Sequence, residues 1–165
     1  MLSTDRLLIR PARAEDAGDL FEVYGDAETM RYWDSPPDQD VPVTAKRVVG
    51  MMRASPQTYF VLEHEGRAVG SAGVHQDAEI GFILHRALWR KGLMREALTV
   101  LIPWLFDTLS TDTLTADADP RNEGSVGLLK AVGFQVTGTA KNTFCVDGVW
   151  TDSVYLALAR DDFAR

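Results

Sequence analysis

The sequence contains little cysteine and histidine and no long hydrophobic run. The single cysteine, Cys145, excludes a disulfide framework and a cysteine-based metal site. The three histidines, His64, His75 and His85, are not spaced as metal ligands, so no metal is expected. No apolar stretch approaches the ~18 residues that a membrane helix requires. Residues 1–10 mix apolar with polar and charged side chains, unlike a signal peptide. A cytoplasmic protein with no membrane partner is therefore expected.

Positive charge is also scarce, with 17 lysines and arginines against 24 acidic residues and a net charge of −7. Nucleic acid is not an expected partner, because phosphate-rich duplexes require a basic face. A cationic or amine substrate would suit the negative field, although solubility alone also accounts for such a charge. The 165 residues, 45% of them apolar, suffice for one domain over 1–165 with a buried core.

Hydrophobic periodicity predicts an α/β fold, with a mixed, mostly antiparallel sheet of about seven strands and helices on both faces. The strand–helix–strand unit over 78–118 implies a parallel strand pair with a right-handed crossover. Pro103 is expected to kink or shorten the helix that contains it. The predicted strands cover 2–10, 58–63, 67–74, 78–84, 113–118, 134–140 and 145–158, the last two joined by a turn at 141–142. The predicted helices cover 15–25, 27–32, 43–53, 92–108 and 122–132.

The first segment that indicates chemistry is Trp89-Arg-Lys-Gly-Leu-Met-Arg-Glu-Ala97, which joins a strand to a long helix. Unpaired amide groups and the helix dipole favour an anion at such a helix start. Arg90, Lys91 and Arg95 add positive charge, and Gly92 permits close approach of a ligand to the backbone. The segment suits a pyrophosphate, although a solvated basic helix start is an equally simple reading. It matches neither the P-loop nor the dinucleotide-binding glycine pattern.

The second segment runs from Asp119 to Phe134 and reads as a capped helix, with Asp119 as the expected N-cap. Asn122 and Ser125 lie three residues apart and therefore share one helix face. Gly124 and Gly127 each disfavour a helix by roughly 1 kcal/mol, so a bound ligand or tight packing on the sheet should explain them.

The third segment, Ala78-Glu-Ile-Gly-Phe-Ile-Leu84, is an apolar strand that contains one carboxylate. Strand alternation places Glu79, Gly81 and Ile83 on one face. Glu79 is either a residue of the solvated face or a placed base. Gly81 weakens the strand and is expected to mark a bulge that opens a cleft.

These segments occur in the order and spacing of the GNAT superfamily, and the chain resembles its branch of ribosomal-protein N-terminal acetyltransferases. The resemblance covers nearly the whole chain and rests on motifs in seven places. They are Thr4-Asp-Arg-Leu-Leu-Ile-Arg-Pro11, Glu79-Ile-Gly-Phe82, Trp89-x-Lys-Gly92, Glu96-Ala-Leu98, Asn122-x-x-Ser125, Gly133-Phe134 and Asp147-Gly-Val-Trp-Thr-Asp152. A GNAT-type fold with a splayed parallel strand pair is implied.

The resemblance also implies an acetyl-CoA-dependent N-acetyltransferase in which an amine attacks the thioester directly. The pantetheine arm would pair with the backbone of Ile83 and Leu84, and the pyrophosphate would bind the amides of Arg90, Lys91, Gly92, Leu93, Met94 and Arg95. Asn122 would hold the cofactor near its thioester. Glu79 would take the amine proton, and Ser125 would protonate the leaving thiolate.

Several positions depart from the family pattern. Trp89 and Met94 replace the first and last residues of the Gln/Arg-x-x-Gly-x-Gly/Ala pattern, and Arg90 stands where this branch often has glycine. A tyrosine that serves as general acid in many relatives corresponds to Leu129 here.

The acceptor pocket is expected between the first two helices, the third strand of the meander and the last hairpin. Tyr32, Trp33, His75 and Trp150 are available there as substrate contacts or as structural side chains. The expected acceptor is a protein N-terminal amine, and a small amine such as a polyamine, an amino acid or an antibiotic is the alternative. A silent acyl-CoA-binding domain is the alternative of another class, and relatives suggest a homodimer by analogy alone.

Overall fold

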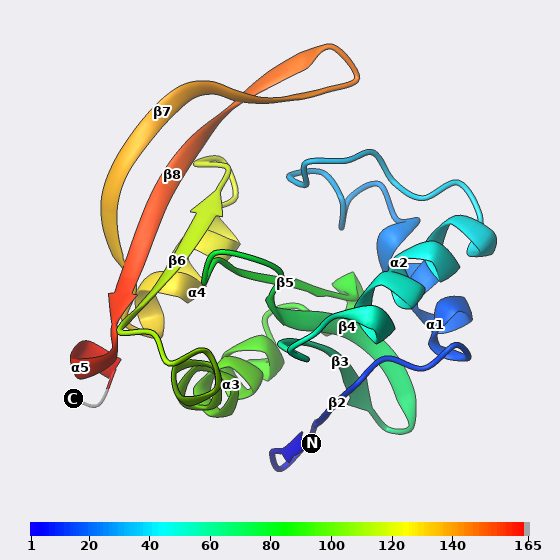
Figure 1. Cartoon of the computed structure of the whole chain (residues 1–165). Coiled ribbons are helices and arrows are strands. Elements are labelled where there is room, and N and C mark those ends of the chain that lie inside the picture. The colour runs from blue at the N-terminus through cyan, green and yellow to red at the C-terminus, as the bar shows by residue number, and fades with distance from the viewer. Residues whose placement is uncertain (164–165) are drawn as a thin grey trace.

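The first five strands form one antiparallel sheet in the computed structural model, which describes residues 1–163 (Figure 1). Their order, β1-β2-β3-β4-β5, follows the chain. These strands are β1 (Leu2–Ser3), β2 (Leu8–Arg10), β3 (Tyr59–His64), β4 (Arg67–Val74) and β5 (Ile80–Leu84). A second antiparallel sheet has the order β6-β8-β7 and comprises β6 (Thr113–Ala118), β7 (Gln135–Val146) and β8 (Val149–Ala159). The mixed architecture is confirmed, with eight strands within residues 1–163 where about seven were expected.

The two sheets meet where β5 begins. Glu79 and Thr115 form an isolated parallel bridge, and the Thr115 amide donates to the Ala78 carbonyl at 3.0 Å. Beyond this point β5 and β6 belong to separate sheets. The predicted splayed parallel pair is therefore present, and the carboxyl half of β5 has an open edge toward β6.

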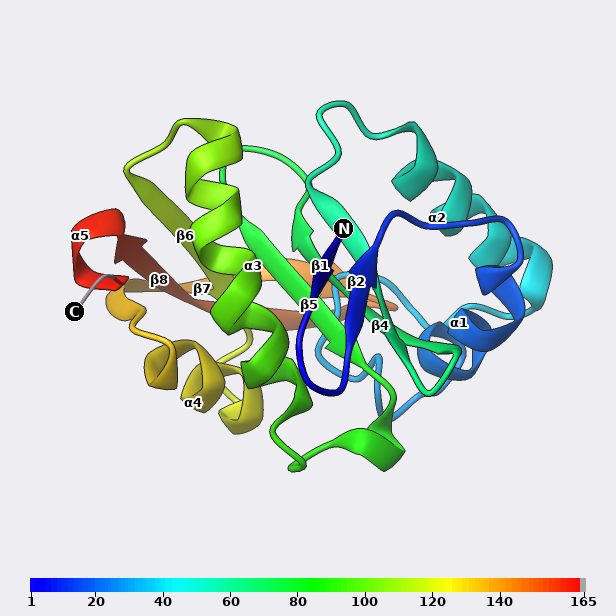
Figure 2. The ribbon, with the colours of Figure 1, turned by 90° about the horizontal axis from the view of Figure 1, so that it is seen from below.

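Helices cover both faces of the larger sheet (Figure 2). On one face α1 (Asp16–Tyr24) and α2 (Val41–Arg53) share a core with Tyr59, Val61 and Ile83. On the other face α3 (Leu93–Leu109) packs in a larger core that also includes residues of α4 (Glu123–Ala131) and of the second sheet. Two short helical turns, η1 (Arg86–Leu88) and α5 (Arg160–Phe163), complete the order. None of the helices within residues 1–163 combines the length and apolarity needed to cross a bilayer.

Helix α3 is the central element of the larger core, because its apolar side chains are buried along its whole length. It starts directly after Gly92, whose φ of 79° is left-handed and unfavourable for other residues. Pro103 lies inside the helix without shortening it. The rings of Phe60 and Trp104, with their centroids 5.1 Å apart, are in contact and join β3 to α3.

A buried charge cluster fixes the start of the chain to the body. The Arg10 guanidinium, 3% exposed, donates to both Asp16 oxygens at 2.7 and 2.9 Å and to Glu63 at 2.6 Å. Burial alone would raise the pKa of Asp16, but hydrogen bonds from Arg10 and the Arg13 amide hold that pKa below its usual value. The cluster therefore joins β2, α1 and β3.

Three predicted elements are wrong. The strand over 2–10 is two strands, because a turn closed by the Thr4 amide and the Leu7 carbonyl folds β1 back on β2. Residues 27–32 form turns rather than a helix, since their hydrogen bonds do not continue as a regular ladder. The last hairpin turns at Asp147-Gly148, where both residues have positive φ, and not at 141–142.

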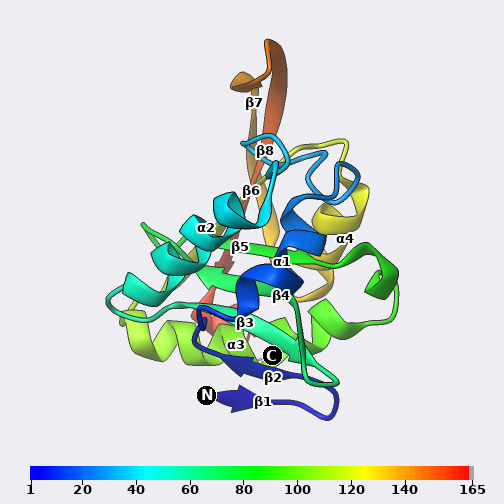
Figure 3. The ribbon, with the colours of Figure 1, turned by 90° about the vertical axis from the view of Figure 1, so that its right-hand side faces the viewer.

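The β7–β8 hairpin extends away from the body as a long arm (Figures 1 and 3). Its outer part exposes apolar side chains, with Phe144 40%, Val149 59% and Trp150 59% accessible. The register of the two strands shifts between Ala140 and Phe144, and Asn142 has a φ of 53°. The break that the sequence suggested at 141–142 is therefore a bulge inside one continuous strand.

Candidate active site

A cavity of about 490 Å³ lies between the end of β5, the start of α3 and the start of α4. Of the fifteen expected catalytic, cofactor-binding and acceptor-binding residues, eleven line it: Tyr32, Trp33, Ile83, Leu84, Arg90, Gly92, Leu93, Met94, Arg95, Asn122 and Ser125. Lys91, Glu79, His75 and Trp150 do not. Segments far apart in the chain are thus brought to one cavity, as the motifs indicated.

The amino end of α3 forms one wall. The first intrahelical hydrogen bond runs from the Glu96 amide to the Gly92 carbonyl at 3.0 Å, so the amides of Leu93, Met94 and Arg95 precede the helical ladder. The left-handed conformations of Arg90 and Gly92 shape the loop in front of them. These amides carry partial positive charge, and the side chains of Arg90 and Arg95 add full positive charges. This wall is therefore suited to an anion.

The end of β5 forms the second wall. The His85 amide donates to the Val69 carbonyl at 2.8 Å, so odd-numbered residues of β5 direct their backbone to β4. Phe82 and Leu84 therefore direct theirs to the open edge. Ile83 lines the cavity, but its backbone amide and carbonyl groups pair with β4. Phe82, rather than the expected Ile83, therefore presents its amide and carbonyl groups at the open edge together with Leu84. The Trp89 indole donates to the Leu84 carbonyl at 2.7 Å and holds the following loop against the strand.

The amino end of α4 forms the third wall. Asn122, rather than the expected Asp119, is the N-cap, and its side-chain oxygen accepts from the Ser125 amide at 3.1 Å. The side-chain NH₂ of Asn122 is consequently left to donate elsewhere. A side chain at Gly124 would contact only the Asn122 side chain, and one at Gly127 would contact nothing within 4 Å. Packing on the sheet therefore explains neither glycine, and Leu129 is buried in the core.

Glu79 lies outside this cavity, beside the bridge that joins the two sheets. Partial desolvation raises its pKa above the usual value, and the carboxylates of Asp117, Asp34 and Asp77 raise it further. Asp117, on the neighbouring strand, also has a raised pKa because of burial, and its Oδ1 has no hydrogen-bond partner within residues 1–163. Several carboxyl groups thus approach one another at the splay.

Two aromatic contacts, one between His75 and Tyr59 and one between Trp33 and Tyr24, lie close to the cavity. His75 stacks on Tyr59 at 3.8 Å between ring centroids, and partial desolvation lowers its pKa. Tyr59 is buried, and its hydroxyl accepts from Ser71, which also contacts the Tyr24 hydroxyl at 2.7 Å. Trp33 packs edge-on against Tyr24 at 6.1 Å. These contacts attach the 27–33 turns to the sheet beside the cavity.

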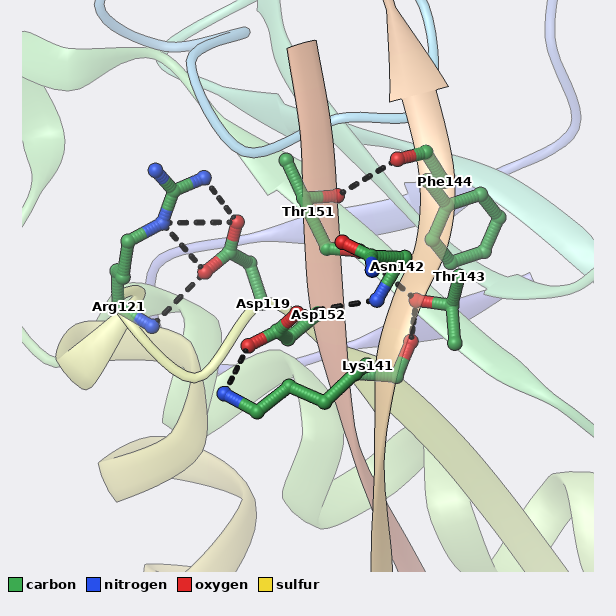
Figure 4. A network of polar contacts seen from close by, with 9 residues as sticks. Asp119, Arg121, Lys141, Asn142, Thr143, Phe144, Thr151 and Asp152 are labelled. Carbon is green, nitrogen blue, oxygen red and sulfur yellow. Dashed lines mark hydrogen bonds and ion pairs between the residues drawn. The ribbon is translucent and has the colours of Figure 1, made fainter.

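The hairpin arm is braced by Asp152. Asp152 accepts from Lys141 Nζ at 2.8 Å and from the Asn142 amide at 3.0 Å (Figure 4). Asp152 therefore stabilises the bulge in β7. Trp150 lies on the arm beyond this brace and is not part of the cavity wall.

Sequence reasoning missed Arg121. Its side chain pairs with Asp119 at 2.6 Å (Figure 4), and its guanidinium lies 5.7 Å from the centroid of the Tyr32 ring. Arg121 therefore links the start of α4 to the 27–33 turns and adds a cation to the cavity wall. Its position directly before Asn122 was the available signal.

Comparisons with known proteins agree on one family. The family model described as acetyltransferase (GNAT) domain matches residues 6–135. The ribosomal protein uS5-alanine N-acetyltransferase of Escherichia coli (strain K12) is 29% identical, over 98% of this chain and 92% of that protein. The spermidine N(1)-acetyltransferase of the same organism is 22% identical, over 99% and 91%. The fold matches that of a GNAT-family acetyltransferase from Bacillus anthracis, with a TM-score of 0.87 and 23% identity over 97% of this chain and 98% of that one.

Proposed function

Because this chain belongs to the GNAT acetyltransferase family and is an N-acetyltransferase, we propose that it transfers an acetyl group from acetyl-CoA to a primary amine by direct attack in a ternary complex. The proposal treats residues 1–165 as one domain. The observation that carries it is the cavity, in which an anion-binding helix start, an open strand edge and the Asn122–Ser125 face converge.

Acetyl-CoA fits the groups present in this cavity. The amides of Leu93, Met94 and Arg95, with the guanidinium groups of Arg90 and Arg95, suit its diphosphate. The outward backbone groups of Phe82 and Leu84 suit the amides of its pantetheine arm. Asn122 would donate near the thioester end. Acetyl-CoA supplies the activated acetyl group, and the protein contributes binding, orientation and proton transfer.

Glu79 is the proposed base. The acceptor must be a neutral amine to attack, so its ammonium form must first lose a proton, and a carboxylate with a raised pKa can accept that proton. Glu79 does not line the cavity, so a bridging water would carry the proton. The new C–N bond forms as the C–S bond breaks, the attacking nitrogen releases its extra proton to water, and the Ser125 hydroxyl, reprotonated by water, would protonate the thiolate.

The acceptor is proposed to be a protein N-terminal amine. An α-amine has a pKa near 8 and a lysine-like amine near 10.4, so the former requires less help from Glu79. A small polyamine is the second candidate, because Glu79, Asp117, Asp34 and Asp77 together favour an acceptor of more than one positive charge. Tyr32, Trp33, His75 and Trp150 are proposed acceptor contacts. A homodimer is included in the proposal, and sedimentation equilibrium would test it.

Release of free thiol from acetyl-CoA over a panel of peptides and amines tests the function. We expect release with at least one α-amine peptide, and a preference for spermidine over peptides would favour the second candidate. Binding of acetyl-CoA without release for any acceptor would instead support a silent acyl-CoA-binding domain, which the loss of tyrosine at Leu129 makes worth testing.

Replacement of Ser125 by alanine is expected to lower kcat by about tenfold, within the range that general acid catalysis contributes. The Km for acetyl-CoA should change little, because the backbone amide that Asn122 caps is retained. Steady-state kinetics with the preferred acceptor would measure both. An unchanged kcat at every pH would transfer the acid role to water.

A further inference from the structure

The Thr4-Asp-Arg6 motif contacts the anion-binding loop, although the two are more than eighty residues apart. Arg6 Nη1 donates to the Lys91 carbonyl at 3.0 Å. Its Nε and Nη2 donate to Glu96 Oε2 at 2.7 and 2.6 Å. Thr4 Oγ1 and the Arg6 amide both donate to the other oxygen of Glu96. The β1–β2 turn thus lies against the start of α3 (Figure 2).

The contact with Lys91 has a consequence for the next amide. A trans peptide unit is planar, and its C=O and N–H point in opposite directions. Arg6 and Lys91 do not line the cavity, whereas Gly92 does. Arg6 holds the Lys91 carbonyl on the side of the loop that faces away from the cavity. The Gly92 amide, which points the opposite way in the same peptide unit, is therefore directed toward the cavity.

The contact with Glu96 has an electrostatic consequence. Glu96 lies in the first turn of α3, where its charge stabilises the helix but would repel a bound diphosphate. A hydrogen bond from Thr4 and those from Arg6 lower the pKa of Glu96, so it is ionised. Arg6 neutralises this charge beside the anion-binding amides.

We propose that Arg6 is a positioning residue for acetyl-CoA, acting through the Lys91–Gly92 peptide and by neutralising Glu96. The inference rests on the proposed function, since it concerns the same cavity. The Arg6 side chain is 46% exposed, so its ion pair contributes little to global stability. Its loss should therefore affect ligand affinity more than folding.

Calorimetric titration of the full-length protein with CoA tests the proposal. We expect Arg6→Gln to weaken the Kd for CoA by about tenfold at full stoichiometry, which corresponds to about 1.4 kcal/mol. A variant that merely failed to fold would instead bind with the original Kd at reduced stoichiometry. Arg67→Gln is the matched control, because the exposed Arg67 also pairs with carboxylates, those of Asp19 and Glu22 in α1, and does not line the cavity.

Glu96→Gln separates positioning from simple loss of an ion pair. We expect it to weaken CoA binding less than Arg6→Gln, by roughly threefold, because it removes the repulsive charge together with the pair. The double variant should bind more tightly than Arg6→Gln alone. Equal losses in both single variants, or an unchanged Kd in Arg6→Gln, would overturn the inference and leave the proposed function intact. A wild-type protein that does not bind CoA would overturn both.

Discussion

Replacement of Arg10 by methionine is expected to lower the free energy of unfolding by about 3–5 kcal/mol, the range for breaking a buried ion pair. Methionine fills much of the space but leaves Asp16, 4% exposed, without the guanidinium that compensates its charge. Glu63 loses the same partner. Urea unfolding at pH 7, followed by tryptophan fluorescence, would measure the change.

The pH dependence adds an independent check. Asp16 has a lowered pKa in the folded state, so its contribution to stability is present above its unfolded pKa and is lost as the pH falls. The deficit of Arg10→Met should consequently shrink below about pH 4. Arg67→Met, which removes an exposed pair, should cost less than about 1 kcal/mol. A similarly small loss for Arg10→Met would show that this cluster does not stabilise the fold.

The second large effect is expected in catalysis. Glu79→Gln should lower kcat by about 10²- to 10³-fold, because glutamine cannot accept the amine proton. The pKa of Glu79 is raised, so wild-type activity should fall on the acid side as this carboxylate becomes protonated. The variant should lack that acid limb. Rates measured from pH 5 to pH 9 with the preferred acceptor would reveal both effects.

Asp77→Asn is the matched control for that variant. Asp77 is exposed, lies two residues from Glu79 and is one of the carboxylates that raise its pKa. The substitution should move the acid limb to lower pH and leave kcat at pH 8 within about twofold, because the base is retained. If Glu79→Gln turns over at the wild-type rate at every pH, Glu79 has no part in the chemistry.

Much of the fold could be predicted because its long elements carry clear periodicity. Helix α3 and strands β4 and β6 fall where the apolar pattern placed them, within a residue or two. The last hairpin was misplaced because Lys141-Asn142 resembles a turn, whereas Asp147-Gly148 has the composition of a tight hairpin turn and closes it. The reversal between β1 and β2 lies at residues 3–6, which are all polar, and this polar run was the local signal that one strand ends there.

The sequence predicted the parts of the site that consecutive residues form. It did not predict the parts that form only when distant segments meet in the fold. The Trp89–Arg95 and Asn122–Ser125 segments identified two cavity walls, because helix starts have the same amide groups in any fold. Strand register decided that Phe82 rather than Ile83 faces the open edge. Arg121 near Tyr32 and Arg6 beside Lys91 depend on distant segments meeting, which no local pattern indicates.

The chain-ordered strands of the larger sheet have a consequence for biosynthesis. All five strands from β1 to β5 are synthesised before α3, yet Phe60, Leu62 and Ile80 bury their side chains in the core that α3 completes. A nascent chain in which β5 has been synthesised but α3 has not therefore exposes this apolar face of the sheet. We expect this interval to be when the polypeptide depends most on chaperones, and pausing codons between β5 and the end of α3 to lower the soluble yield.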